Sequence, residues 1–397
     1  MKPAENINMD RAFRALDSFQ IEIPSWGFAN TGTRFGKFVQ AAAASSIEEK
    51  FADAAEVNRL TGVTLTLALH VLWDLPKGEA DLRAVRELEG RYGIKAGSIN
   101  PNLFQDQEYK YGSLCNPSAE IRGHALAHML NSVEIAKAVG SRDISLWLAD
   151  GSNYPGTQSM RKRIGWLEEA LCVVHEHLGP NQRLLVEYKP FEPAFYHTDI
   201  ADWGMSSHLA KHAGPKACVL VDTGHHYQAQ NIEQIVAWLL HTGMLGGFHF
   251  NDRRYADDDL TLGSIDPYQI FRIFHEIHSA AIDGLKLDVA YMVDQSHNLK
   301  GKIEAMIQTV MTAQELYLKA ALVDSEQLSQ LQHSCDLVAA EELFRGAFWT
   351  DVRPVIAAWR ETHGLPADPL AAFRASGYVE RISRERGKRA SAVSNYA

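Results

Sequence analysis

The chain has 397 residues, 46% of them apolar, so it can bury a substantial core in one or two domains. Its formal net charge of -10 argues against a nucleic-acid partner, because binding a polyanion needs a basic surface. The four cysteines lie far apart with no CxxC pair, which argues against a thiolate zinc site and suits the reducing cytoplasm. No stretch approaches the roughly 20 apolar residues of a membrane span, and the N-terminus lacks the apolar core of a signal peptide. We therefore expect a cytoplasmic protein without a membrane partner.

Short apolar segments rich in β-forming residues alternate with longer amphipathic segments along most of the chain. The expected strands lie at residues 20–24, 64–70, 94–100, 143–150, 183–190, 217–224, 246–252 and 287–296. Helical segments such as 45–62, 117–140 and 231–243 carry apolar residues three to four positions apart and end in glycine. Eight strand-helix units predict an α/β fold, a (β/α)8 TIM barrel over residues 1–321.

An open, doubly wound sheet is the alternative to a barrel. A dinucleotide-binding sheet would carry GxGxxG directly after its first strand, and the glycines of SWGFANTGTRFG at 25–36 do not have that spacing. After about residue 322 the alternation stops and only helical segments follow. We expect residues 322–397 to form a C-terminal helical extension that ends in a polar tail and that contacts a neighbouring subunit or frays.

Polar residues gather where the expected strands end, and in a barrel the active site is built at that end. In chain order these residues are His70, Glu187, Lys189, Asp222, His225, His249, Asp294 and Ser296. A single histidine on an apolar strand is more often a core residue than a ligand. Several carboxylates in one water-poor mouth, however, are costly unless cations pair with them, and one lysine cannot neutralise them all.

The segment GGFHFNDRRYADDDL, residues 246–260, adds three consecutive aspartates after the seventh strand. A solvated acidic loop is the simplest interpretation, but two divalent ions explain the whole set. One ion would be bound by Glu187, Asp222, His249 and Asp294, and the second by Asp222, His225, Asp257 and Asp259. Oxygen ligands with a few imidazoles and no thiolate favour Mn²⁺, Mg²⁺ or Co²⁺. Asp258, between two ligands, would point elsewhere.

Seven segments place the chain near a known family: IEIPSWGFANTGTRFGKF, ALHVLWD, GSINPNLFQDQEYKYGS, EYKPFEPAFY, DTGHH, GGFHFNDRRYADDDL and MVDQSHN. In these segments, which span residues 21–298, the chain resembles the bacterial metal-dependent L-rhamnose isomerases of relaxed specificity, in the xylose-isomerase-like superfamily. The segment FRASGYVERI extends the resemblance into the C-terminal region.

The resemblance implies a role for each site residue. It implies two divalent ions per subunit, Mn²⁺ first among the candidates, bound by the two ligand sets above. It places Lys189 beside the sugar O1, His70 at the ring oxygen and Ser296 near metal-bound water, and these three with Asp259 would be the catalytic residues. Trp73 and Trp147 would form pocket walls, and Glu187, Asp222 and His225 would also contact the sugar. The protein would be a homotetramer in which each subunit contributes Phe35 to the active site of a neighbouring subunit.

These expectations define a metal-dependent aldose-ketose isomerase. It would convert L-rhamnose to L-rhamnulose, and also accept L-lyxose, L-mannose or D-allose, by ring opening and a 1,2-hydride shift. The nearest alternative is a single-metal ketose 3-epimerase, which has a glutamate at the position of Asp294. A metal-dependent phosphodiesterase related to apurinic endonucleases conflicts with the acidic charge. An inactive sugar-binding protein would not need the complete ligand set.

Overall fold

A computed structural model describes residues 7–30, 38–76, 79–192, 195–255, 257–296 and 299–390 of the chain. It confirms the TIM barrel, with one eight-stranded parallel sheet in the order β1-β2-β3-β4-β5-β8-β9-β10. The strands are β1 (Ile23–Pro24), β2 (Thr66–His70), β3 (Lys95–Asn100), β4 (Asp143–Leu146), β5 (Arg183–Glu187), β8 (Ala217–Asp222), β9 (Leu245–Phe250) and β10 (Ala290–Val293).

The sheet closes on itself through Glu22, which precedes β1. The backbone N–H of Glu22 donates to the carbonyl of Tyr291, and Val293 N–H donates back to the carbonyl of Glu22, at 2.8 and 2.9 Å. These bonds join the first strand to the last, so the barrel interior is enclosed. The first strand is shorter than the sequence predicts, and Pro24 within it has no N–H to donate to the sheet.

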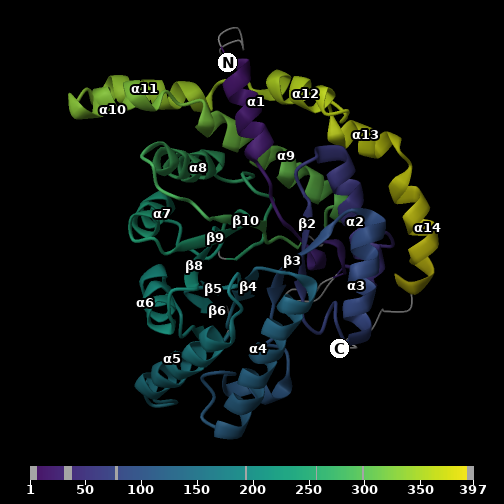
Figure 1. Cartoon of the computed structure of the whole chain (residues 1–397), viewed down its shortest axis with the longest axis vertical. Helices are drawn as coiled ribbons and strands as arrows, with labels where there is room; N and C mark the ends of the chain where they lie inside the picture. The colour runs from purple at the N-terminus through teal and green to yellow at the C-terminus, as the bar shows by residue number, and fades with distance from the viewer. Residues whose placement is uncertain are drawn as a thin grey trace.

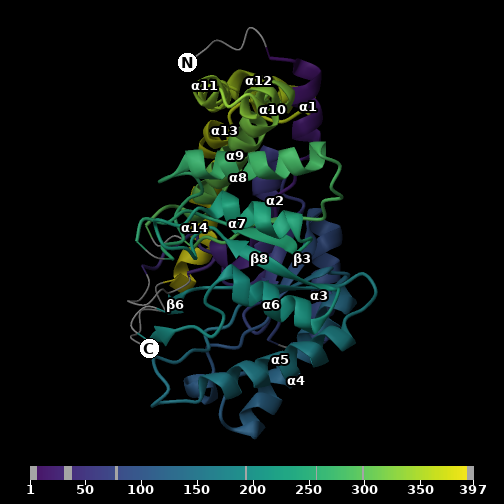
Figure 2. The same ribbon diagram turned by 90° about the vertical axis from the view of Figure 1, so that its left-hand side faces the viewer.

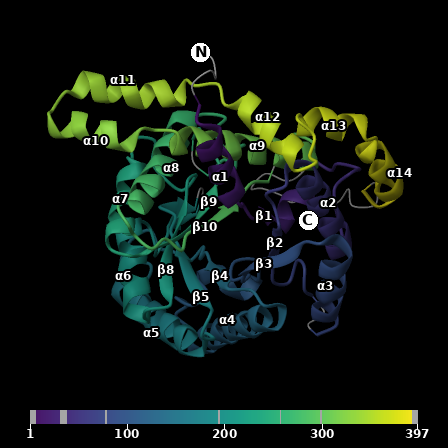
Figure 3. The same cartoon turned by 45° about the horizontal axis from the view of Figure 1, so that its top comes forward.

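Helices surround the strands in the ring seen in Figure 3. They are α2 (Ile47–Thr61), α3 (Glu79–Tyr92), α4 (Ala119–Val139), α5 (Met160–His177), α6 (Trp203–Ala213), α7 (Ile232–His241), α8 (Pro267–Ile282) and α9 (Lys302–Ala321), with α1 (Met9–Ser18) preceding the barrel. The expected terminal glycine is present in α2, where Gly62 ends the helix at φ 76°, and Ser46 and Glu49 form a capping box at its start. Among the described helices, none is both long enough and apolar enough to cross a bilayer.

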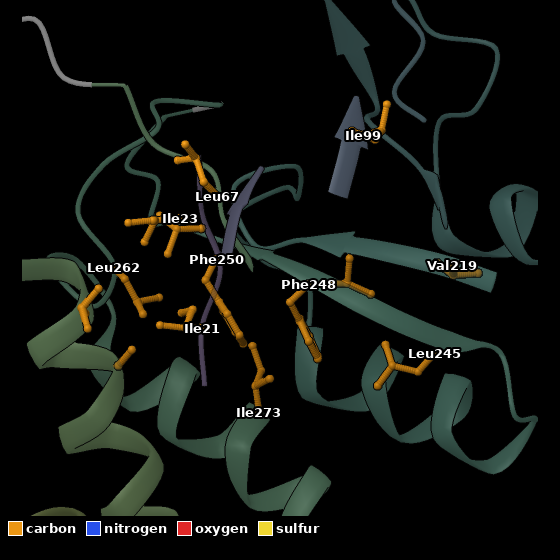
Figure 4. Close-up of a cluster of buried hydrophobic side chains, with 14 of the residues drawn as sticks. Ile21, Ile23, Leu67, Ile99, Val219, Leu245, Phe248, Phe250, Leu262 and Ile273 are labelled. Carbon is orange, nitrogen blue, oxygen red and sulfur yellow. The ribbon is translucent and has the colours of Figure 1, made fainter. Parts of the chain in front are cut away.

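The core has two parts, one outside the barrel wall and one inside it. Figure 4 shows part of the outer core, where Phe248 and Phe250 of β9 lie beside Ile273 of α8. Inside the barrel, Leu185, Leu220 and Met292 form a separate buried cluster. Gly247 of β9 lies beside this layer, and a Cβ there would be only 3.1 Å from that of Ala290 and 3.3 Å from Leu220 Cδ1.

This inner layer supports the functional end of the barrel. Each of its three residues stands two positions before a candidate metal ligand, so the ligand faces the same side of the strand, one pleat higher. Glu187 follows Leu185, Asp222 follows Leu220, and Asp294 follows Met292. The three carboxylates therefore lie directly above the buried apolar layer of Leu185, Leu220 and Met292.

The C-terminal helices cover one side of the barrel (Figures 1 and 2). They are α10 (Ser325–His333), α11 (Leu337–Phe348), α12 (Arg353–Thr362), α13 (Pro369–Ala375) and α14 (Tyr378–Ala390). The extension was expected to contact a neighbouring subunit or to fray, but its last helix, α14, contacts α2 of the same chain. Arg386 donates to both carboxylate oxygens of Asp53, at 2.8 and 3.0 Å, and Tyr378 donates to Asp53 at 2.9 Å. Whether the extension also contacts another subunit stays a prediction.

A buried histidine between α8 and α9 is expected to make the fold sensitive to acid. The ring of His278 packs 4.5 Å from that of Tyr317, its Nε2 has no hydrogen-bond partner in the described part of the chain, and burial lowers its pKa to about 4. The unfolded chain, with a histidine pKa of about 6.5, binds the extra proton between these two values. Folding stability therefore falls as the pH drops from 6.5 to 4, by up to about 3 kcal/mol from this group.

The variant His278→Gln has no such proton to bind. In urea unfolding at pH 7.5, 6, 5 and 4.5, we expect the stability difference between the wild type and this variant to shift steadily in the variant's favour as the pH falls. A difference that is constant across this range would contradict the prediction.

Candidate metal centre

Four predicted ligands from adjacent strands meet at the carboxyl end of the barrel. Glu187 of β5, Asp222 of β8, His249 of β9 and Asp294 after β10 each offer one ligand atom, and these atoms all lie within 4.8 Å of one another. Glu187, Asp222 and His249 are nearly fully buried, with exposed fractions of 3%, 0% and 3%. The structure therefore brings these four predicted residues together, and their role as metal ligands stays a prediction.

The pKa values of the three carboxyl groups indicate that additional positive charge would stabilise their ionised forms. Burial raises the pKa of Asp222 to about 7; the nearby His225 lowers it, but Glu187 and Asp294 add repulsion. Burial also raises the pKa of Asp294, against the partial compensation of His249. The pKa of Glu187 is about 2 only because His249 and His225 outweigh its burial.

A divalent cation fits these residues. His249 Nδ1 lies 3.2 Å from Glu187 Oε2, yet without the alignment of a hydrogen bond, so this buried nitrogen has no hydrogen-bond partner in the described part of the chain. The set offers three carboxylates and one imidazole at short range, which is the ligand chemistry that Mn²⁺, Mg²⁺ and Co²⁺ accept.

Residues of the second predicted ligand set, His225, Asp257 and Asp259, line the same cavity. His225 Nε2 lies 3.1 Å from Asp257 Oδ1, and the other oxygen of Asp257 accepts from Lys189 Nζ at 2.5 Å. Asp259 lines the same cavity, where burial and then the charges of Asp257 and Asp294 raise its pKa well above the usual range. In the described structure, Asp257 is thus paired with cationic side chains, and its role as a ligand stays a prediction.

The backbone conformation of residues 257–259 separates the three consecutive aspartate side chains. Asp257 and Asp259 have φ values of 50° and 48°, in the left-handed region that few residues other than glycine adopt. Asp258 faces away, as predicted, and its carboxylate accepts from the backbone N–H groups of Arg254 and Tyr255 at 2.5 and 2.6 Å. Alternate aspartates therefore reach the cavity while the middle one binds its own loop.

A cavity of about 330 Å³ lies above the ligands, and its two sides differ. It is lined by Trp26, His70, Trp73, Asn100, Pro101, Phe104, Ser145, Trp147, Glu187, Lys189, Glu192, His225, His249, Asp257, Asp259, Asp294 and Ser296. The charged residues come mainly from β5, β8, β9, β10 and the loops after them. Neutral and aromatic residues from β2, β3 and β4 form the other side. A cavity of about 630 Å³ between α9, α12 and α13 is larger but does not contain this ligand cluster.

His70 is held firmly on the neutral side. Its Nδ1 lies 3.0 Å from the carbonyl of Val71, which makes Nδ1 the donor and leaves the lone pair on Nε2. Burial lowers the pKa of His70 to about 4, so the ring is neutral at physiological pH. The carboxylate of Asp74 accepts from the His70 backbone N–H at 2.7 Å and binds Lys50 at 2.5 Å, which fixes the turn after β2.

Lys189 stands between the two sides. Its ammonium group is 2.7 Å from Glu192 and lies 5.0 Å from the ring centre of Trp147. Burial opposes its charge, but Asp257 and Glu192 outweigh burial and raise the pKa of Lys189. A fixed cation at this point can stabilise negative charge on a ligand oxygen.

The remaining predicted residues fall into two groups. Trp73, Trp147 and Ser296 line the cavity, and Trp73 stacks on His70 with ring centres 3.7 Å apart. Phe35 lies outside the described residues. The sequence reasoning missed Trp26, Asn100, Phe104, Ser145, Glu192 and Asn251. The sequence positions of two of them gave a signal: Asn251 stands two positions after His249, and Trp26 stands two positions after Pro24, the end of the first strand.

The fold and site together define a TIM barrel with a candidate metal centre at the carboxyl ends of its strands. The chain belongs to the xylose isomerase-like TIM barrel family, whose sequence pattern matches residues 51–306. It is 38% identical to a protein of Mesorhizobium japonicum named "Probable sugar isomerase", over 96% of this chain and 89% of the relative. A "Probable sugar isomerase" of Rhizobium meliloti is 39% identical over the same shares.

More distant relatives share the fold at low identity. The xylose isomerase of Thermus thermophilus is 26% identical over 53% of this chain and 57% of its own length. Among solved structures, a D-allulose 3-epimerase from Methylomonas sp. superposes with a TM-score of 0.55 at 14% identity, covering 76% of this chain and 98% of that one. At this identity the likeness shows the barrel alone.

Proposed function

We propose that the chain is a metal-dependent aldose-ketose isomerase that interconverts L-rhamnose and L-rhamnulose and accepts other aldoses. The observation that carries the proposal is the cluster of Glu187, Asp222, His249 and Asp294 within 4.8 Å, facing a cavity with a neutral histidine on its other side. The names of the two relatives that match over 96% of this chain support sugar isomerisation. The resemblance in the segments after each strand supports L-rhamnose as the substrate.

In this proposal His70 opens the sugar ring. Its Nε2 carries the lone pair, so it can accept the proton of the anomeric hydroxyl as the ring oxygen leaves C1, and then return that proton to the ring oxygen. Burial keeps this imidazole neutral at pH 7 and ready to accept. Trp73 stacks on the imidazole of His70 and holds that side chain in place.

The open-chain sugar then rearranges between the two sides of the cavity. Divalent ions bound by the carboxylates would polarise O1 and O2 of the sugar. Lys189 stabilises negative charge at O1 while the C2 hydrogen moves to C1 as hydride, and the O2 proton passes to O1. Ser296 and Asp259, both lining the cavity, orient the water that carries this proton.

The proposal has further parts that follow from the family resemblance. The metal in use is Mn²⁺, with two ions per subunit. L-lyxose, L-mannose and D-allose are additional substrates. The enzyme is a cytoplasmic homotetramer in which Phe35 completes the site of a neighbouring subunit. Light scattering of the purified protein measures the oligomer directly.

A ketose 3-epimerase is the second candidate. The D-allulose 3-epimerase structure shares the barrel, which favours this reading at the level of fold only. An epimerase moves a proton at C3, whereas the proposed isomerase moves hydrogen between C2 and C1. The residues His225, Asp257 and Asp259 have a use in the two-ion scheme and none in a single-ion epimerase.

One experiment separates these reactions. The purified enzyme is freed of metal with EDTA, reloaded with Mn²⁺, and given aldoses and ketoses in D₂O. We expect ketose from L-rhamnose only in the reloaded sample, with no deuterium at C1. Deuterium at C1 would contradict the hydride route, exchange at C3 of a ketose would indicate epimerisation, and equal activity without metal would overturn the proposal.

Ser145 is expected to influence which sugar is preferred. Ser145 and Trp147 line the cavity, and neither the Ser145 hydroxyl nor the Trp147 Nε1, both buried, has a hydrogen-bond partner in the described part of the chain. A buried polar group without a partner costs roughly 1–3 kcal/mol, which a sugar hydroxyl could recover. Since the net contribution of one neutral hydrogen bond is about 0.5–1.5 kcal/mol, Ser145→Ala should lower kcat/KM for the sugar that supplies this hydroxyl by about 2–12-fold.

The measurement compares each aldose with its deoxy counterpart, beginning with L-mannose and L-rhamnose, which differ at C6. The wild type should discriminate within one such pair, and Ser145→Ala should reduce that discrimination. Ser206→Ala, which removes a buried hydroxyl bonded to the carbonyl of Val186, is the matched control and should leave every ratio unchanged. Unchanged ratios in Ser145→Ala for every pair would refute the prediction.

A further inference from the structure

Two neutral side chains contact the carboxylates of the candidate metal centre without being ligands themselves. We propose that Asn251 and Trp26 are positioning residues, which direct one oxygen of Asp222 and one oxygen of Asp294 toward a bound cation. The inference rests on the proposed metal dependence and extends it to residues for which the sequence predicted no role.

Asn251 orients Asp222. The amide nitrogen Nδ2 of Asn251 lies 3.0 Å from Oδ1 and 3.1 Å from Oδ2 of Asp222, and the backbone N–H of Gly224 donates to Oδ1 at 2.6 Å. Oδ1 therefore has two donors, while Oδ2 shares only the amide. Both Asp222 and Asn251 are completely buried. The carboxylate cannot turn without losing these bonds, so Oδ2 is the oxygen with more capacity left for a cation.

The backbone of Asn251 is itself held in place by Thr223. The hydroxyl of Thr223 donates to the backbone carbonyl of Asn251 at 2.8 Å, and the backbone N–H of Asn251 lies 3.0 Å from the same hydroxyl oxygen. The amide oxygen lies over Gly224, where a Cβ would be 2.5 Å from it. Gly224 thus leaves room for the oxygen, and the amide nitrogen faces the carboxylate.

Trp26 orients Asp294 by a hydrogen bond to one of its two carboxylate oxygens. The indole Nε1–H donates to Oδ1 of Asp294 at 2.8 Å, and this nitrogen can only donate. The other oxygen, Oδ2, is the one within 3.8 Å of His249 Nδ1, inside the ligand cluster. Trp26 belongs to the short helix η2 (Ser25–Phe28) directly after β1, and its exposed fraction is 8%.

The neutrality of both donors matters. An arginine or lysine in either place would cancel the carboxylate charge and compete with a cation for it. An amide and an indole restrict rotation of the carboxylates but leave the full negative charge available. Outer groups that orient metal ligands typically contribute about 10–100-fold to metal affinity.

The test is Mn²⁺ binding to the full-length, metal-free protein, measured by equilibrium dialysis and by the Mn²⁺-dependent rise in Tm. Asn251→Ala and Trp26→Phe should each weaken Mn²⁺ binding by about 10–100-fold. Asn116→Ala is the matched control: Asn116 is also buried and donates to the carbonyl of Gly112 at 2.6 Å, but it does not line the cavity. This variant should keep the wild-type affinity. Thr223→Val, which removes the hydroxyl that holds Asn251, should weaken binding to a smaller extent, and it replaces Asn251→Ala if that variant does not fold.

The outcomes are distinct. Affinities of the Asn251 and Trp26 variants within about 2-fold of the wild type would overturn the inference while leaving the proposed function intact. An equal loss in Asn116→Ala would also overturn it, because general destabilisation would then explain the effect. A wild type that binds no Mn²⁺ would refute the proposed function instead, and this inference with it.

Discussion

Replacing Asp222 with asparagine is expected to reduce kcat/KM for aldose isomerisation by about 10³-fold or more. Asp222 is fully buried on the apolar layer formed by Leu220 and its neighbours, and it is the carboxylate proposed to be shared by both ions. Asparagine has the same shape but no charge, so the variant should fold while losing Mn²⁺. The measurement is kcat/KM at saturating Mn²⁺, together with the number of ions bound per chain.

The acidic loop offers a matched control for this variant. Asp258 has the same side chain, but its carboxylate accepts from the backbone N–H groups of Arg254 and Tyr255 and points away from the cavity. Asp258→Asn keeps an oxygen for those bonds and should retain close to wild-type activity. The prediction fails if Asp222→Asn keeps wild-type activity, or if Asp258→Asn loses as much.

The second large effect concerns stability. Arg386→Ala is expected to lower the free energy of unfolding by about 3–5 kcal/mol, because it leaves the carboxylate of Asp53 buried without its cation. Asp53 is 1% exposed, and burial already raises its pKa to about 6 despite the two bonds from Arg386. Without Arg386 the carboxyl group should take up a proton more readily, so the loss should be larger at pH 8 than at pH 5.

Urea unfolding at the two pH values tests this result. Combining Arg386→Met with Asp53→Leu removes both charges and should recover part of the loss, since a buried pair replaced by apolar groups is often tolerated. Arg353→Ala, which breaks an exposed pair with Asp351, should change the stability very little. A loss below 1 kcal/mol in Arg386→Ala at pH 8 would show that the C-terminal helix α14 is not fastened in this way.

Much of the fold could be predicted from the sequence because each barrel unit carries its own signals. The alternation of β-rich and amphipathic segments predicted all eight strands, and the residue at each strand end followed from its position. The strand ends themselves were placed too late: β5 ends at Glu187 and β10 at Val293, so Lys189 and Ser296 lie in loops. Periodicity alone does not indicate where the hydrogen bonds to the neighbouring strand stop.

The contacts between distant segments were harder to predict. Trp26 reaches Asp294 across 268 positions, and Arg386 reaches Asp53 across 333. Such pairs depend on how the barrel closes and how the extension packs, and neither leaves a local pattern. Lys189 and Asp257 were predicted for different roles, and their ion pair is visible only in three dimensions.

The division of the cavity into a charged side and a neutral side has a consequence for how any ligand enters. Charge that is confined to one half of the rim creates a directional field, and low-dielectric aromatic walls opposite concentrate it. A ligand with oxygens at one end and a carbon-rich surface at the other has one favourable orientation in this cavity. Entry the other way round would place the oxygens meant for the carboxylates against the rings of Phe104 and Trp73 instead, so the two ends of the molecule are distinguished before any bond changes.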